Sequence, residues 1–135
     1  MGILFKEEKM TDILLSIKPE FVARIFSGDK KFEFRKVIPT AQVDKIYIYA
    51  TRPICAVVGY ASVSGIISDN PDILWNKTDK YAGIARDFFD FYFSGRARAH
   101  AYCLENVIKY NVPRSLSEFG ISAAPQNFIY IKNKN

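Results

Sequence analysis

The order of strand-like and helix-like segments most constrains what this chain can fold into. Strands show as apolar alternation, and helices as apolar residues three or four positions apart. The two patterns do not alternate regularly, as a doubly wound parallel sheet requires. We therefore predict an α+β fold, a small curled sheet or partial barrel of about five or six strands flanked by helices. The predicted strands are 12–17, 28–36, 45–50, 54–67, 96–110 and 127–132, and the predicted helices are 19–28, 69–78 and 81–95.

The chain has the size and apolar content of one folded domain. It holds 135 residues, of which 49% are hydrophobic and 15% aromatic. That content suffices for a core, and disordered chains are poorer in aromatic residues. Because residues 1–11 show no clear pattern, we predict an N-terminal extension over 1–11 and a single domain over 12–135.

Net charge and the lack of export signals limit the possible partners and the cellular location of the protein. Lys and Arg total 19 against 14 Asp and Glu, which gives a net charge of +5. This excess suits an anionic partner such as nucleic acid without requiring one. No apolar run approaches the ~18 residues of a membrane span, and the first residues do not resemble a signal peptide. We expect a cytoplasmic protein without membrane contact, in which Cys55 and Cys103 are buried free thiols rather than a disulfide.

One charged strand combines apolar and polar positions. It reads GDKKFEFRK over residues 28–36. Because side chains alternate along a strand, Phe32 and Phe34 share one face, while Lys31, Glu33 and Arg35 share the other. We expect the Phe face to be buried. The charged face is either a solvated surface with an internal ion pair or the wall of a site, and alternation alone does not choose between them.

The segment around this strand resembles a known family. Residues 14–36 read LLSIKPEFVARIFSGDKKFEFRK. A strand ending in Ser-Ile, then a helix, then Gly-x-Lys-x-x-Glu-x-Arg is the pattern of the ASCH family, a branch of the PUA-like superfamily. Later stretches, including IYATRP and VVG, are similar too, so the likeness runs over residues 12–132. The matching positions in the pattern are Ser16, Ile17, Gly28, Lys30, Glu33 and Arg35.

This resemblance implies a PUA-like β-barrel with helices beside it and a cleft lined by the pattern residues. Members of the family bind RNA or modified nucleotides, and some are ribonucleases. One branch deacetylates 4-acetylcytidine with a Lys, which corresponds to Lys30, and with a Thr and a Glu. Glu33 stands where that branch has its Thr, and a carboxylate does not replace an attacking hydroxyl. If the chain is an enzyme, we expect Glu33 to act as a general base and Lys30 to supply positive charge.

Five residues are candidates for binding a nucleotide. Arg35 has a planar guanidinium that suits a phosphate or a base edge. Ser16 and Lys18 lie where the first strand meets its helix, whose free N–H groups attract anions. Taken singly, such residues also fit a solvated surface. The set is Ser16, Lys18, Lys30, Arg35 and Arg52.

Aromatic residues leave two alternatives open. Tyr47 and Tyr49 are in phase on one strand, which fits either base stacking or packing under the helices. The stretch DFFDFYF, residues 87–93, fits an aromatic platform, but its helical spacing favours core. On that helix, Ile84, Phe88 and Tyr92 form one stripe.

The sequence lacks four common motifs: a phosphate-binding loop, a glycine-rich dinucleotide-binding turn, a pair of zinc ligands and a Ser-His-Asp triad. We therefore expect no cofactor and no metal. The lone His100 is expected to be structural.

Our first interpretation is an RNA- or nucleotide-binding module that reads a nucleotide in a charged cleft. One alternative is a small hydrolase, an amidohydrolase or ribonuclease, acting on RNA or on a modified nucleoside. Another is a protein-interaction module of unknown partner. The sequence alone does not decide whether the chain is an enzyme.

Overall fold

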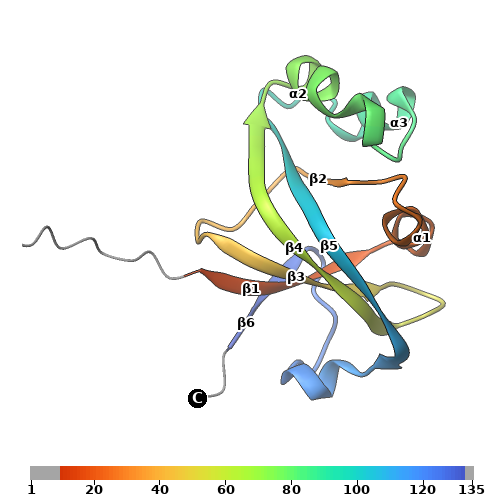
Figure 1. The fold of residues 1–135 in the computed structure, drawn as a ribbon. Helices are drawn as coiled ribbons and strands as arrows, with labels where there is room; N and C mark the ends of the chain where they lie inside the picture. Colours follow the sequence, from red (N-terminus) through yellow and green to blue (C-terminus); the bar gives the residue numbers. More distant parts are fainter. Residues whose placement is uncertain (1–9, 133–135) are drawn as a thin grey trace, which may run out of the picture.

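Residues 10–132, as described by a computed structural model, form one six-stranded mixed sheet with three α-helices (Figure 1). The α+β class predicted from the sequence is therefore confirmed. The strands are β1 (Thr11–Ile17), β2 (Phe32–Arg35), β3 (Val43–Ala50), β4 (Ala56–Asp69), β5 (Ala99–Arg114) and β6 (Phe128–Ile131). The helices are α1 (Pro19–Ser27), α2 (Pro71–Thr78) and α3 (Arg86–Tyr92), with 3₁₀ turns at Asp79–Tyr81 and Leu116–Phe119. The extension predicted over 1–11 lies outside the described residues except for its last two positions, and Thr11 already belongs to β1.

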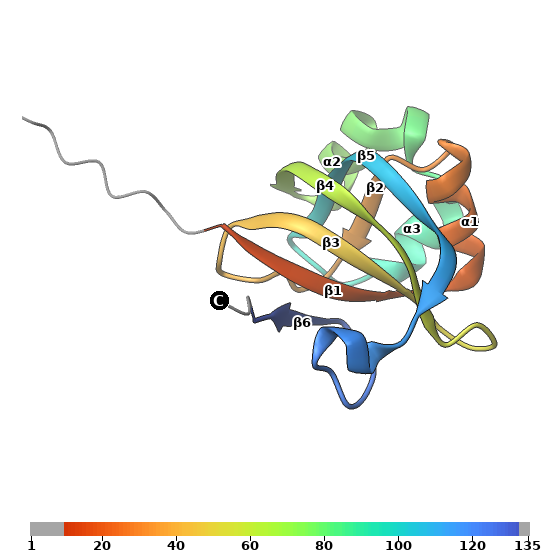
Figure 2. The ribbon, with the colours of Figure 1, turned by 60° about the horizontal axis from the view of Figure 1, so that its bottom comes forward.

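The strands follow the order β2-β5-β4-β3-β1-β6 across the sheet. β1 and β3 run parallel, and all other neighbouring strands in this order are antiparallel. Figure 2 shows how the sheet curls, with β1 and β6 brought forward. Within residues 10–132, backbone pairing does not join the two edge strands, β2 and β6. The barrel expected from the family resemblance is therefore an open, curled sheet.

The long strand β4 is irregular where glycines occur. Its register against β5 shifts between Val57 and Gly59 and again between Val63 and Gly65. A Cβ atom on Gly59 would collide with the backbone oxygen of Ile108 on β5. The close approach of the two strands therefore requires glycine at this position.

The three helices pack against the sheet through two apolar clusters. The main cluster joins the inner faces of β1 and β3 to Val22 and Ile25 of α1. A second cluster lies beneath α2 and α3, where Phe34 meets Phe89 edge to face at 5.1 Å. Phe34 is buried and Phe32 half-buried against this second cluster, which confirms the prediction that the Phe face of the charged strand belongs to the core.

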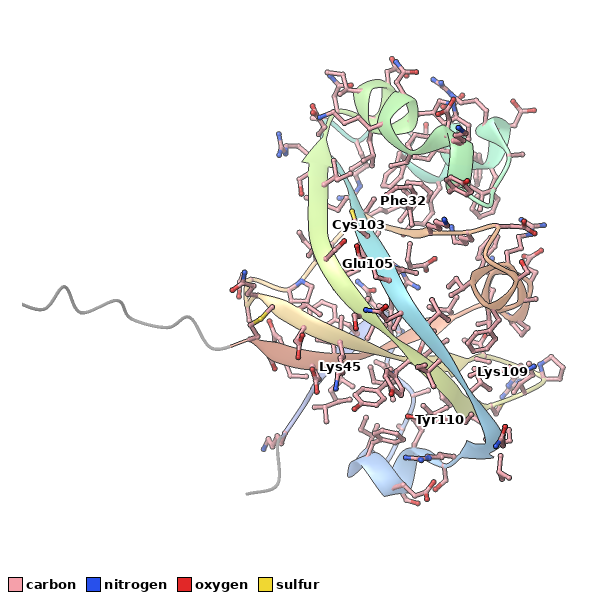
Figure 3. The ribbon with its side chains drawn as sticks, in the orientation of Figure 1. Phe32, Lys45, Cys103, Glu105, Lys109 and Tyr110 are labelled. Carbon is pink, nitrogen blue, oxygen red and sulfur yellow. The ribbon has the colours of Figure 1, made fainter. Side chains whose placement is uncertain are left out.

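Three expectations from the sequence need correction. α3 is shorter than the predicted 81–95, and although Phe89 is buried in it, Phe91 of the same stretch is 83% exposed, so DFFDFYF is core only in part. Tyr49 is buried under the segment that follows β5, not under the helices, because that segment covers the outer face of β3. Both cysteines are free, but Cys55 is exposed, since it lies in the turn between β3 and β4, and Cys103 is only half-buried (Figure 3).

No helix within the described part of the chain is long and apolar enough to cross a membrane.

Candidate active site at the open edge of the sheet

A pocket of about 470 Å³ lies between the end of β1, the start of α1, β2 and α3. Five of the six residues predicted for a site line it, although they come from separate parts of the chain. The five are Ser16, Lys18, Lys30, Glu33 and Arg35. Arg52 does not line this pocket; it is exposed in the turn after β3, next to Thr51, which does.

Local backbone structure explains how β2 presents its charged residues. Gly28 ends α1 in the left-handed conformation, with φ of 89°, and so turns the chain toward β2. The backbone N–H of Lys30 then donates to the carbonyl of Arg24 at 3.0 Å. Because β2 is extended, Glu33 and Arg35 point to the same side, as predicted. Lys31, which was predicted to share this face, lies before β2, is exposed and does not line the pocket.

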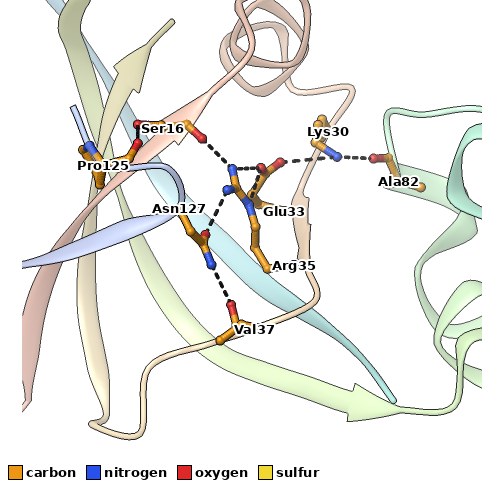
Figure 4. A network of polar contacts seen from close by, with 8 residues as sticks. All are labelled: Ser16, Lys30, Glu33, Arg35, Val37, Ala82, Pro125 and Asn127. Atoms are coloured by element: carbon orange, nitrogen blue, oxygen red, sulfur yellow. Dashed lines mark hydrogen bonds and ion pairs between the residues drawn. The ribbon is translucent and has the colours of Figure 1, made fainter. Parts of the chain in front are cut away.

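Arg35 is the centre of a polar network (Figure 4). Its Nη2 and Nε donate to Oε2 of Glu33 at 2.7 and 3.2 Å. Nη2 also donates to the backbone oxygen of Ser16 on β1 at 2.7 Å, and Nη1 donates to Oδ1 of Asn127 at 3.0 Å. Asn127, just before β6, donates from Nδ2 to the backbone oxygen of Val37 at 3.0 Å. Side chains therefore connect the two sheet edges that backbone pairing leaves apart.

Lys30 is buried beside this network, with 2% of its surface exposed. Its Nζ donates to the backbone oxygen of Ala82 at 2.8 Å and lies 3.7 Å from Oε1 of Glu33. Burial lowers the pKa of the Lys30 ammonium below its ordinary value of 10.5, while the nearby Glu33 carboxylate partly opposes this change. Lys30 is therefore a poorly hydrated ammonium group, which interacts strongly with any anion placed beside it.

Gly83 leaves the space that Lys30 occupies. It adopts the left-handed conformation with φ of 68°, and a Cβ atom there would collide with Cβ and Cγ of Lys30. The next-door carbonyl of Ala82 is the one that Lys30 binds. The sequence pattern did not single out Gly83, because its contact with Lys30 joins residues far apart in the chain.

Glu33 has one oxygen held by hydrogen bonds and one that is paired only with the ammonium of Lys30. Both donors of Arg35 bind Oε2, whereas Oε1 has no hydrogen bond to any residue in 10–132. Tyr102 of β5 lies opposite Glu33 of β2 in the strand pairing and is fully buried. Its hydroxyl has no hydrogen-bond partner in residues 10–132. Burial raises the pKa of the Tyr102 hydroxyl above its ordinary value.

The charges of the pocket favour an anion. Lys18, Lys30 and Arg35 carry positive charge, and Glu33 is the only carboxylate among its lining residues. Apolar rings complete the wall, among them Phe88 and Tyr92. The predicted stripe of Ile84, Phe88 and Tyr92 does share one face of its segment; all three residues line the pocket, and Ile84 and Tyr92 also pack against the second apolar cluster.

His100 does not line the pocket. Its Nδ1 lies 2.6 Å from Oγ of Ser68, and burial lowers the pKa of its imidazole. Within residues 10–132, groups of three or more His, Cys, Asp or Glu side chains arranged to hold a metal ion do not occur. The side chains at hand in the pocket are thus an ammonium, a guanidinium and a carboxylate, a set suited to binding an anion and moving one proton.

Comparison with known proteins supports the family resemblance. The model of the ASCH domain matches residues 15–114. An ASCH domain-containing ribonuclease of Zymomonas mobilis subsp. mobilis is 36% identical over 104 residues, which cover 72% of this chain and 70% of that protein. The crystal structure of ASCH from Zymomonas mobilis superimposes with a TM-score of 0.82 and 29% identity, covering 90% of this chain and 88% of that one.

Other relatives are much longer than this chain. It is 30% identical over 129 residues to large ribosomal subunit protein uL22 of Ureaplasma parvum serovar 3, and it spans only 42% of that protein's length. The ASCH match covers the strands and helices that build the pocket, and the Zymomonas structure shares the fold. The chain therefore belongs to the ASCH domain family, with a PUA-like fold.

Proposed function

We propose that the protein is a ribonuclease that cleaves RNA in the pocket beside β2. The buried network of Lys30, Glu33 and Arg35, open to a pocket with excess positive charge, carries the proposal. The similarity to a ribonuclease of the same family supports it over the first interpretation, a module that only binds RNA. A cytoplasmic location, expected from the sequence, would place the protein among its RNA substrates.

The 2′-hydroxyl of RNA offers a route that uses these three side chains. In this route the 2′-oxygen attacks the adjacent phosphorus and bonds to it. The bond between phosphorus and the 5′-oxygen breaks, and the 5′-oxygen leaves as a hydroxyl after taking a proton from water. Oε1 of Glu33, free of hydrogen bonds to residues 10–132, accepts the proton of the 2′-hydroxyl. Lys30 stabilises the negative charge that grows on the phosphate, an effect that is strong because the ammonium is poorly hydrated.

Arg35 holds Glu33 in place in this mechanism. Its two bonds to Oε2 leave Oε1 as the oxygen able to take a proton. Its bonds to Ser16 and Asn127 fix the guanidinium from the other side. We therefore assign Arg35 to positioning the base, and Lys18, exposed at the pocket wall, to binding a phosphate.

The test compares the parent protein with Glu33→Gln on single-stranded RNA, with products identified by mass. The substitution preserves shape but removes the base, so we expect cleavage to fall by ~10²–10⁴-fold while RNA affinity changes little. Glu105→Gln is the matched control, since Glu105 is exposed on β5 and does not line the pocket (Figure 3). Circular dichroism of each variant checks the fold.

The products also test the route. Attack by the 2′-oxygen leaves a 2′,3′-cyclic phosphate, and RNA with deoxyribose at the cleavage site stays intact. Binding without cleavage of any RNA by the parent would refute the proposal in favour of a binding module. Release of acetate from 4-acetylcytidine, with RNA left intact, would identify an amidohydrolase instead.

A further inference from the structure

Two aromatic rings of α3 at the mouth of the pocket have no part in the proposed chemistry. Phe88 and Tyr92 lie one helical turn apart, with ring planes 8° from parallel and centroids 6.3 Å apart. Phe88 is 38% exposed. Phe21 of α1 packs edge-on against Phe88 at 5.4 Å, and Phe93 packs against Tyr92 at 4.8 Å. The rings therefore form a supported shelf whose orientation is fixed before any ligand arrives.

A lysine ammonium lies over each ring of this shelf. Nζ of Lys18 lies 5.9 Å from the centroid of Phe88, and Nζ of Lys36 lies 4.7 Å from that of Tyr92. Neither lysine forms an ion pair with a carboxylate in residues 10–132. Because a lysine has a long, flexible stem, its ammonium can turn from the ring to an anion without backbone movement.

Two aromatic rings, each with a mobile cation close to it, match the repeating chemistry of a single-stranded nucleic acid. Successive bases stack on aromatic side chains, while positive groups follow the backbone phosphates. Only an unpaired base presents its face in this way. A protein segment would need two carboxylates and a flat side chain at the same spacing, a rarer combination than a base between two phosphates.

We propose that Phe88 and Tyr92 form a second nucleotide subsite, in which the base next to the reacting nucleotide stacks on the rings and Lys18 and Lys36 bind the flanking phosphates. This inference rests on the proposed function, because it takes RNA as the ligand of the pocket. It adds that the enzyme recognises a run of at least two unpaired nucleotides, and that a single nucleotide fills only part of the site.

Affinity for uncleavable RNA tests the subsite apart from catalysis. The probes are fluorescent uridine oligomers of one to six nucleotides in which fluorine replaces every 2′-hydroxyl. For the hexamer, we expect Phe88→Ala to weaken binding by about 5- to 100-fold, the range for loss of one stacked base. Phe91→Ala is the matched control, because Phe91 belongs to the same helix, is exposed and does not line the pocket; its effect should stay below about twofold.

The lysines are tested through salt dependence. Loss of one phosphate contact to a single strand lowers the slope of log affinity against log salt by about 0.7. We expect this change for Lys36→Ala but not for Lys45→Ala, the matched control, since Lys45 also lies over a tyrosine, 5.7 Å from the ring centroid of Tyr60, but away from the pocket. Circular dichroism and thermal unfolding verify that all variants fold.

The outcomes separate this inference from the proposed function. Hexamer affinity that is unchanged in Phe88→Ala, or reduced equally for one nucleotide and for six, would overturn the subsite even if the parent cleaves RNA. A parent that binds the hexamer through Phe88 but cleaves no natural RNA would keep the subsite and refute the ribonuclease. A parent that binds none of the oligomers and cleaves no natural RNA would refute both.

Discussion

Replacing Arg35 with Met should lower the free energy of unfolding more than the same replacement of an exposed arginine does. Met has a similar length but no charge and no N–H donor. The change leaves three acceptors without their donor: Oε2 of Glu33, the carbonyl of Ser16 and Oδ1 of Asn127. The side chains of Arg35 and Glu33 are only 12% and 6% exposed, so water does not readily replace the lost donors.

The size of the effect follows from burial. Removing one partner of a buried ion pair typically costs about 3–5 kcal/mol, because the other charge stays buried and unpaired. Lys30 remains 3.7 Å from Oε1 of Glu33 and compensates in part, so we expect a loss near 3 kcal/mol, the lower end of that range. Proteins of this kind are stable by roughly 5–15 kcal/mol, so the variant should fold but unfold earlier.

Urea denaturation at pH 7 measures this loss. With a slope of about 1–3 kcal/mol per molar urea, the midpoint should fall by roughly 1–3 M. Arg86→Met is the control, since Arg86 binds Asp72 at 2.8 Å and Asp90 at 2.9 Å but is 41% exposed; its loss should stay below about 1 kcal/mol.

Salt gives a second criterion for Arg35. At 1 M salt the screening length is about 3 Å, so any contribution of the exposed Arg86 should disappear while that of the buried Arg35 persists. Arg35→Met unfolding within 1 kcal/mol of the parent, or losing its effect in salt as Arg86→Met does, would refute the view that this network holds the two sheet edges together.

Two further substitutions probe the surroundings of the site. Tyr102→Phe removes a buried hydroxyl without a partner in residues 10–132, so the free energy of unfolding at pH 7 should stay equal or rise by up to about 1 kcal/mol. Because burial raises the pKa of Tyr102 above its ordinary value of 10.0, the parent should also lose stability relative to the variant above pH 10, where only the unfolded chain releases that proton. Gly83→Ala should displace Lys30 and reduce RNA cleavage at least tenfold, whereas Gly95→Ala, with a similar positive φ but open space around it, should lose stability and keep its activity. A stability loss above 1 kcal/mol in Tyr102→Phe, or equal cleavage by the two alanine variants, would contradict these assignments.

Short-range periodicity predicted the alternation within β2, although the observed strand, Phe32–Arg35, is shorter than the predicted 28–36. The repeat of two along a strand depends only on neighbouring residues, and it placed Glu33 and Arg35 together on the side opposite Phe34. The repeat of 3.6 worked equally well for α3, since Phe88 and Tyr92 do share a face. A repeat does not reveal what covers a face, however, and this face borders the pocket as well as the second apolar cluster.

The long-range contacts of the site could not be predicted from the sequence, for a physical reason. Asn127 meets Arg35 across 92 positions of the chain, and Lys30 meets the carbonyl of Ala82 across 52. These pairs depend on the order of the strands and on the curl of the sheet, which local patterns do not encode. Asn127 belonged to the predicted strand 127–132 and Gly83 to the predicted helix 81–95, but neither pattern indicates what these residues contact.

The open edge of the sheet and the pocket have the same cause. If β2 paired with β6 through backbone hydrogen bonds, the ladder would fill the space between them and leave no mouth. Instead Arg35 and Asn127 join the two edges through side chains, which are long enough to leave room beside them. The same arrangement shields Glu33 and Lys30 from water, and shielding strengthens their action on an anion. In this domain, the polar network that joins the two unpaired sheet edges therefore also supplies the charged side chains of the candidate site.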